Sequence, residues 1–203
     1  MTLLRLSPRL SRRALFGAGA STILAGLALR GVAADQALLP ATPQCRDDDD
    51  PTPAQTEGPY FTPGSPERAN LVDEGMKGDR ISLAGFVLDR RCQPVPRALL
   101  DLWHADADGQ YDNQGYRLRG HQFSDAQGRF VFETIVPGLY PGRTRHFHLK
   151  VQAPGRDILT TQLYFPGEPQ NARDGIFNKA LLMDVEQEAG TKIGRYDFVL
   201  DVG

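Results

Sequence analysis

The stretch ISLAGFVLDRRCQPVPRALLDLW, residues 81–103, decides the fold class of this chain. Two apolar runs, 81–89 and 97–103, flank the polar turn RRCQPVP, and both runs contain residue types that favour strands. Further short apolar runs bounded by turn residues occur at 120–125, 129–135, 145–154, 160–166 and 195–202. Several short strands separated by turns are typical of an all-β sandwich or barrel.

The rest of the sequence is consistent with one all-β domain. No long segment with a 3.6-residue period occurs after residue 56, and NKALLMDV at 178–185 is the candidate for a short helix. We therefore predict a single-domain β-sandwich over residues 57–203, with short helices and long loops around the metal site considered below. The formal net charge of −2 and the lack of a basic stripe indicate that nucleic acid is not a partner.

Residues 1–34 have the layout of an export signal. Four arginines and no acidic residue precede or flank a mostly apolar run at 14–29, and small residues follow at 31–35. Arg12 and Arg13 lie in SRRALF, which resembles the twin-arginine signal. The apolar run is shorter than the roughly 20 residues that a membrane span requires. We expect a cleaved signal, no stable membrane anchor, and a periplasmic or extracellular protein.

A polar, proline-containing linker is predicted at residues 35–56. It contains Cys45, and Cys92 is the other cysteine of the chain. In an export compartment these two cysteines would either form one disulfide or remain as two thiols, and the sequence leaves both alternatives open.

The segment RTRHFH at 143–148 is the strongest indication of a metal site. Successive side chains of a strand point to opposite faces, so His146 and His148 share one face while Phe147 and Leu149 share the apolar, core-facing one. Two histidines at i and i+2 can converge on one metal ion, and imidazole suits zinc, copper, iron and nickel alike.

Further ligands are harder to find from residue types alone. His104 and His121 are isolated, and we expect a core or surface role for each, which leaves a zinc site poorly supported. Tyr111 and Tyr140 lie in polar or Pro/Gly-rich loops. A phenol ionises near pH 10, so a phenolate at neutral pH needs a strong Lewis acid such as ferric iron beside it. Residue types alone favour half-buried loop tyrosines that use their polar tips.

The order and spacing of these residues resemble the intradiol ring-cleavage dioxygenases, the family of protocatechuate 3,4-dioxygenase and catechol 1,2-dioxygenase. The resemblance runs from TEGPYF at 56–61 to QLYFPG at 162–167, and residues 83–111 fit the family's signature segment. It implies a mononuclear non-haem iron site, with one Fe(III) per chain. Its ligands would be Tyr111, Tyr140, His146 and His148.

The resemblance also implies roles for residues around the metal. Arg143 and Gln162 match the active-site arginine and a supporting glutamine, and Tyr140 would also act in catalysis. Tyr60 and Arg143 would contact the substrate, although a packing role is an equal alternative for Tyr60. Cys92 stands in a turn where the family usually has Gly or Ser.

Two departures from the family pattern lie next to the histidine pair. Thr144 and Arg145 replace the usual Pro-Ala. The connection from Tyr140 to His146 is shorter than in catabolic members, which implies a more open mouth of the active site.

The activity implied by the resemblance is intradiol cleavage of a catechol-type ring by O2 to a cis,cis-muconate-type dicarboxylic acid. The partners would be the catechol and O2, and a homo-oligomer is compatible with the sequence. One alternative is a transthyretin-like or carboxypeptidase-regulatory-like sandwich that binds without a metal. Another is an exported copper or zinc protein that adds His104 or His121 to the histidine pair.

Overall fold

The computed structural model describes residues 50–188 and 190–202. The predicted signal, most of the predicted linker and Cys45 lie outside the described residues. Cys92 is in a disulfide. Among the described residues, no helix is long and apolar enough to cross a membrane.

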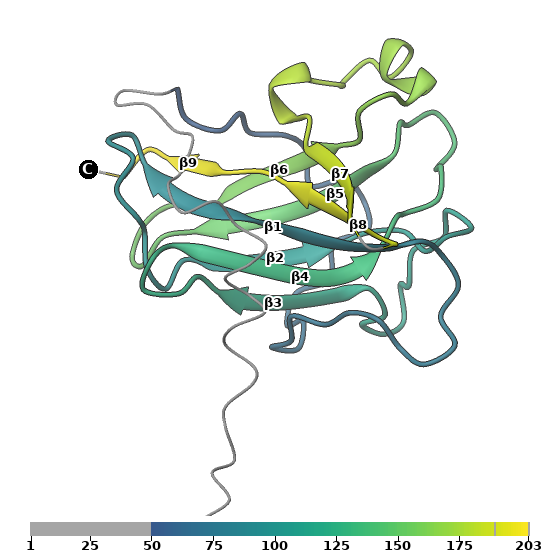
Figure 1. Cartoon of the computed structure of the whole chain (residues 1–203), viewed down its shortest axis with the longest axis horizontal. Coiled ribbons are helices and arrows are strands. Elements are labelled where there is room, and N and C mark those ends of the chain that lie inside the picture. The colour runs from purple at the N-terminus through teal and green to yellow at the C-terminus, as the bar shows by residue number, and fades with distance from the viewer. Residues whose placement is uncertain (1–49, 189, 203) are drawn as a thin grey trace, which may run out of the picture. The chain divides into compact units, whose positions relative to one another are not determined.

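Nine strands in the described part of the chain form two sheets, as predicted for a sandwich (Figure 1). The first sheet has the order β4-β1-β8-β7, and β9 pairs with the end of β1. Its strands are β1 (Arg80–Asp89), β4 (Arg129–Ile135), β7 (Asp184–Glu188), β8 (Thr191–Arg195) and β9 (Phe198–Leu200). The second sheet has the order β3-β2-β5-β6 and contains β2 (Leu99–Trp103), β3 (Arg119–Phe123), β5 (His146–Gln152) and β6 (Leu159–Tyr164).

The two sheets enclose one apolar core. Leu83 of β1 and Phe132 of β4 come from the first sheet, and Leu100, Phe147 and Leu149 come from the second. All five side chains are fully buried. The predicted core face of the strand that carries the histidines is therefore confirmed.

The prediction of a helix over 178–185 is wrong. A single 3-10 turn, η2 (Lys179–Leu181), occupies its start, and β7 begins at Asp184. The side chain of Asn178 accepts a hydrogen bond from the backbone of Ala180, and Leu181 is buried. Asp184 and Val185 pair with β8, and the amide of Met183 donates to the Tyr164 carbonyl, so tertiary pairing outweighs local preference.

The predicted last strand, 195–202, is also divided differently. Arg195 ends β8, and only 198–200 forms β9. A second 3-10 turn that was not predicted, η1 (Pro169–Ala172), lies between β6 and η2. Figure 1 shows the segment with both 3-10 turns as an excursion beside β6 and β7.

Residues 52–61, which precede β1, run from β9 of the first sheet to the outer face of the second sheet. The amide of Thr52 donates to the carbonyl of Val199 at 2.9 Å, and the amide of Gln55 donates to that of Thr160 at 2.8 Å. Farther along, the ring of Phe61 packs against Trp103 with centroids 4.8 Å apart. This segment therefore closes over the face from which the two histidines project.

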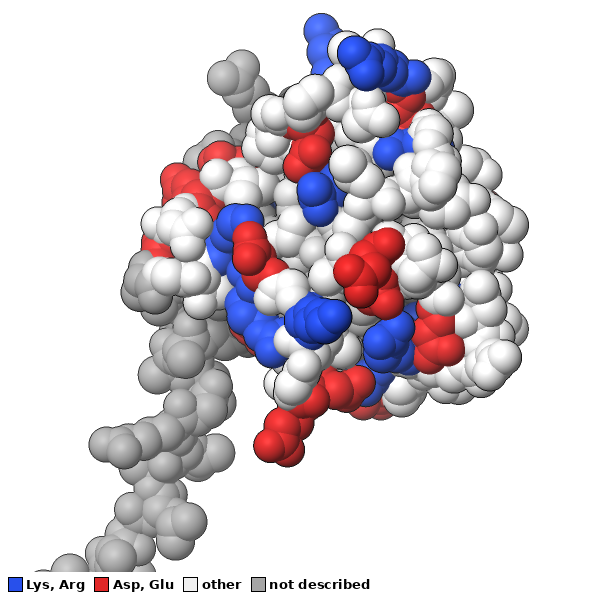
Figure 2. Space-filling model, turned by 90° about the vertical axis from the view of Figure 1, so that its right-hand side faces the viewer, with Lys and Arg blue, Asp and Glu red and all other residues white. Residues whose placement is uncertain are grey.

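Basic and acidic side chains are interspersed on the face shown in Figure 2. Exposed ion pairs of the domain include Arg195 with Glu186 at 2.5 Å and Lys192 with Asp79 at 2.6 Å.

Candidate metal centre

The two histidines of β5 converge, as the strand alternation predicts. Their Nε2 atoms are 3.1 Å apart, and their ring centroids are 4.7 Å apart. The face that carries them is not open to solvent, because His146 and His148 are only 4% and 3% exposed. The covering segment passes directly over them: a Cβ atom on Gly58 would lie 3.4 Å from Cε1 of His148.

Each imidazole is held in a defined orientation. His146 Nδ1 is 2.6 Å from the carbonyl oxygen of Thr144, so Nδ1–H donates and Nε2 keeps its lone pair. The ring of His148 stacks on Trp103 at 4.9 Å with an angle of 10° between the planes. Burial lowers the pKa of His146 to about 4 and the pKa of His148 well below its ordinary value. Both imidazoles are therefore neutral, which is the form that binds a metal.

Three tyrosines meet beside the pair. Tyr111 Oη lies 3.5 Å from His146 Nε2. Tyr60 stacks on Tyr111 with centroids 4.5 Å apart, and its Oη is 2.8 Å from Tyr140 Oη. Burial raises the pKa of the Tyr111 phenol, and the nearby positive charge of Arg143 acts in the opposite direction.

This arrangement fits a small, highly charged metal ion. Two nitrogen lone pairs that face each other at 3.1 Å repel unless a proton or a cation lies between them. Two imidazole nitrogens bound to one ion at about 2.1 Å and a right angle would be about 3 Å apart. A buried phenol completes the cluster, and it becomes an anionic ligand only beside a strong Lewis acid.

The remaining histidines do not join the pair. His104 is buried, and its two ring nitrogens are each 2.7 Å from a partner, the Ala105 carbonyl and Thr134 Oγ1. His121 Nδ1 lies 3.1 Å from Ser65 Oγ. Within residues 50–188 and 190–202, no group of three or more His, Cys, Asp or Glu side chains could hold a metal ion. The copper or zinc alternative is therefore not favoured.

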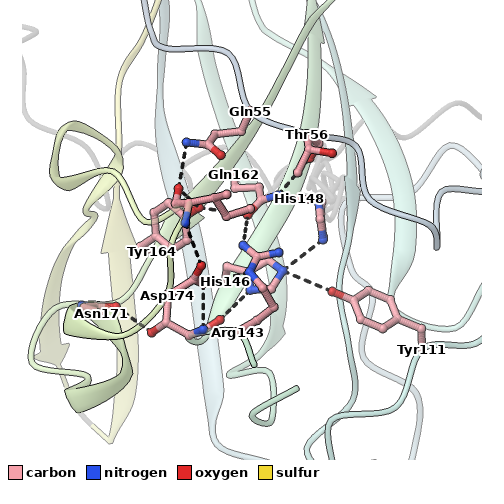
Figure 3. Close-up of polar contacts among 12 residues, drawn as sticks. Gln55, Thr56, Tyr111, Arg143, His146, His148, Gln162, Tyr164, Asn171 and Asp174 are labelled. Carbon is pink, nitrogen blue, oxygen red and sulfur yellow. Dashed lines mark hydrogen bonds and ion pairs between the residues drawn. The ribbon is translucent and has the colours of Figure 1, made fainter. Parts of the chain in front are cut away.

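The predicted arginine and glutamine lie together beside the histidines (Figure 3). Arg143 Nη2 donates to Gln162 Oε1 at 2.6 Å, and Gln162 Nε2 donates to the carbonyl of Thr56 at 2.8 Å. Gln162 pairs with His148 in the register of β5 and β6. The structure thus places Tyr111, Arg143 and Gln162 beside the histidine pair, and Tyr140 joins this cluster through its contacts with Tyr60 and Tyr111.

Two further residues belong to this cluster and were missed in the sequence. Asp174 Oδ2 accepts from Arg143 Nε at 2.8 Å, and Tyr164 Oη donates to Gln162 Oε1 at 3.0 Å. Asp174 lies 31 residues from Arg143 in an irregular segment, so no spacing or periodicity marks it. Tyr164 is two residues after Gln162, and strand alternation alone could have placed it on the same face.

Comparison with known proteins agrees with this site. A dioxygenase family model matches residues 56–202. The chain is 33% identical over 152 residues to hydroxyquinol 1,2-dioxygenase of Nocardioides simplex, covering 63% of this chain and 52% of that protein. It is 36% identical over 127 residues to the protocatechuate 3,4-dioxygenase beta chain of Burkholderia cepacia, covering 53% of this chain and 54% of that protein.

A solved structure gives a stronger match. The dioxygenase domain of a dioxygenase and carbohydrate-binding protein fusion from Streptomyces sp. SirexAA-E is 56% identical, with a TM-score of 0.74. The match covers 76% of this chain and all of that domain. The chain spans about half the length of the curated relatives described above. Because the family model matches most of the sequence, the chain belongs to the intradiol ring-cleavage dioxygenase family.

Proposed function

We propose that this protein is an Fe(III)-dependent intradiol dioxygenase that cleaves a catechol-type ring with O2 to a cis,cis-muconate-type dicarboxylic acid. The observation that carries the proposal is that His146 Nε2 lies 3.1 Å from His148 Nε2 and 3.5 Å from Tyr111 Oη. Family membership supports it, and the binding-module alternative is not favoured.

Tyr111, Tyr140, His146 and His148 would hold the iron. When bound, ferric iron would supply a Lewis acid that ionises phenols and a template for the catechol. Overall, one catechol and one O2 give one dicarboxylic acid that contains both oxygen atoms of O2.

Tyr140 and Tyr60 are placed to handle a substrate proton. Their hydroxyl groups are 2.8 Å apart, so a proton taken up at Tyr140 Oη has a hydrogen-bond partner in Tyr60. Tyr60 also stacks on Tyr111, so its ring would lie beside a planar aromatic substrate bound at the metal. We infer that Tyr60 lines the substrate pocket.

Arg143 would stabilise negative charge that develops on the ring. Its guanidinium is held by Gln162 and Asp174, so it is preorganised before the substrate binds.

We infer an open mouth for the site. An open cavity of about 440 Å³ adjoins the first predicted ligand and is lined by Tyr111, Asp112, Asn113, Gln114 and Arg117. Its polar lining suits aromatic rings that carry further hydroxyl or carboxylate groups.

The test uses untagged protein loaded with iron. We expect one iron per chain, a burgundy colour from tyrosinate-to-iron charge transfer, and O2 uptake with at least one of catechol, protocatechuate, hydroxyquinol and caffeate. Removal of iron should abolish uptake, and zinc should not restore it. A colourless protein with one tightly bound zinc, or an iron-loaded protein that cleaves none of the four compounds, would overturn the proposal.

We also propose that the protein is exported through the twin-arginine route. The support is SRRALF before an apolar run. Replacing Arg12 and Arg13 by lysine should leave the protein in the cytoplasm, whereas blocking the general secretory route should not. Normal export of the double-lysine variant would contradict this.

A further inference from the structure

The segment from Phe165 to Phe177 is fastened to the two residues that precede the histidine pair. Thr144 Oγ1 donates to Asn171 Oδ1 at 2.6 Å, and the amide of Thr144 donates to Asp174 Oδ2 at 2.9 Å. Next to it, Arg145 Nε donates to Glu168 Oε1 at 2.8 Å. Three hydrogen bonds thus join residues 144–145 to one segment, and we refer to them as the clamp.

The usual Pro-Ala of the family could make none of the three. Proline has no N–H and no hydroxyl group, and alanine has no polar side chain. The side chain of Thr144 is fully buried, and Arg145 and Glu168 are each about one quarter exposed. The two departures from the family pattern therefore have one shared structural consequence, which is the anchoring of the segment that carries Asp174.

A single carboxylate oxygen of Asp174 bonds to both Arg143 and Thr144. Its Oδ2 accepts from Arg143 Nε at 2.8 Å and from the amide of Thr144 at 2.9 Å. The carbonyl of Thr144 in turn accepts from His146 Nδ1 at 2.6 Å. One buried carboxylate thereby fixes both Arg143 and the amide of Thr144, the residue whose carbonyl orients a predicted iron ligand.

The carboxylate is also charged. Burial alone would raise the pKa of Asp174, but the hydrogen bond from the Thr144 amide and the Arg143 guanidinium lower it below its ordinary value. A further hydrogen bond comes to Oδ1 from the amide of Ile176 at 3.1 Å. An ionised acceptor makes shorter and stronger hydrogen bonds than a neutral one, so it restricts the guanidinium more tightly.

We propose that Asp174 is a positioning residue that holds Arg143 at the substrate, and that Thr144 and Arg145 clamp it there in this chain. The inference rests on the proposed function for its catalytic consequence, but the coupling between Asp174 and Arg143 exists without iron or substrate. Asp174 itself touches neither the predicted ligand atoms nor the substrate position. The effect on rate that we propose passes through Arg143, and retention of iron in an Asp174 variant separates it from an effect through Thr144 and His146.

A double-mutant cycle tests this. The variants are Asp174→Asn, Arg143→Ala and the double variant, with Glu186→Gln as a matched control that removes a carboxylate from an exposed ion pair. We expect Asp174→Asn to keep its iron and its charge-transfer colour while kcat falls about 10- to 100-fold. In the Arg143→Ala background the same change should lower kcat less than about 2-fold, and Glu186→Gln should leave kcat unchanged.

The same cycle on iron-free protein separates this inference from the proposed function. Thermal unfolding should show a loss of Tm in the double variant that is smaller than the sum of the single losses. Additive losses in Tm, or an iron-loaded Asp174→Asn variant with wild-type kcat, would overturn the inference. If the wild-type protein cleaves no catechol, the proposed function fails, and the unfolding cycle still decides whether Asp174 and Arg143 are coupled.

A second variant covers the case in which Asp174→Asn does not fold. Thr144→Val together with Arg145→Ala removes two of the three clamp bonds and leaves Asp174 and Arg143 in place. We expect iron to be retained, protease cleavage within 165–177 to accelerate, and kcat to fall about 10-fold. Unchanged kcat and unchanged cleavage in this variant would overturn the clamp.

Discussion

Burial determines the protonation state of the residues at this site. His146 and His148 are neutral because their side chains are desolvated, and their Nε2 atoms face each other. Tyr111 is protonated for the same reason until a cation compensates its charge. Asp174 is ionised because the Thr144 amide and the Arg143 guanidinium lower its pKa below its ordinary value. The site thus combines neutral metal donors with one preorganised positive group.

Tyr111→Phe should remove one ligand without removing the aromatic packing on Tyr60. We expect turnover to fall at least about 100-fold and the visible absorption to weaken, since losing a ligand costs more than losing the partner of a ligand. The measurements are the absorption spectrum, iron content and O2 uptake. Tyr116→Phe is the control, because Tyr116 is exposed and its hydroxyl donates to the Pro63 carbonyl. Equal turnover in the two variants would remove Tyr111 from the ligand set.

Arg143→Ala should retain iron and lose rate. Removing one preorganised donor costs about 100- to 1,000-fold in kcat. The kcat of Arg143→Lys should lie between those of wild type and Arg143→Ala. Lysine keeps the positive charge but lacks the planar guanidinium that bonds to both Asp174 and Gln162. Steady-state kinetics on iron-loaded protein checks both variants. A wild-type kcat in Arg143→Ala would exclude the proposed charge stabilisation.

At the scale of elements, strand β5 performs two tasks with its two faces. Phe147 and Leu149 fill the core, and His146 and His148 project from the other side. Cross-strand register adds the rest, since His148 lies opposite Trp103 on one neighbour and Gln162 on the other. The loops supply the tyrosines, so the rigid sheet carries the histidines while the loops complete the site.

Phe147→Ala should lower the stability of the fold and not only the activity. A fully buried Phe truncated to Ala costs about 3–5 kcal/mol, and we expect this loss in the free energy of unfolding by urea. Phe123→Ala on edge strand β3 is the control, because Phe123 is 41% exposed and should cost about 1 kcal/mol or less. Similar losses in the two variants would contradict the assignment of faces on β5.

At the scale of the whole domain, the sandwich buries several titratable groups that gain no charge partner. His104 is the clearest, since burial lowers its pKa from 6.5 to about 4. The unfolded chain therefore binds a proton between these values that the folded domain does not. Stability from this group is fully present above pH 6.5 and is lost as the pH falls toward 4.

His104→Gln should flatten the dependence of stability on pH. Relative to the variant, wild-type protein should lose roughly 3 kcal/mol of unfolding free energy between neutral pH and pH 4. The measurement is urea unfolding of the iron-free proteins across this range, because the other buried histidines are common to both and cancel. Parallel curves for the two proteins would show that His104 does not titrate in this way.

Part of the candidate site could be predicted because strand alternation is local. The spacing of His146 and His148 predicts a shared face, and Phe147 between them predicts the core side. The short 3-10 turn and β7 were mistaken for a helix because residues 178–185 are apolar enough for either, and only the partner strand β8 decides between them. Asp174 could not be predicted, because one carboxylate in an irregular segment has no periodicity.

By itself, the sequence determined the all-β class, the alternation of β5 and the order of residues that resembles the intradiol family. Each of these depends on neighbours within a few residues or on a short motif. Only the tertiary structure decided that the histidine face is covered, that Tyr60 reaches Tyr140, and that Arg145 bonds to Glu168. These contacts join segments far apart in the chain, so the packing of two sheets and their loops, rather than local preference, determines them.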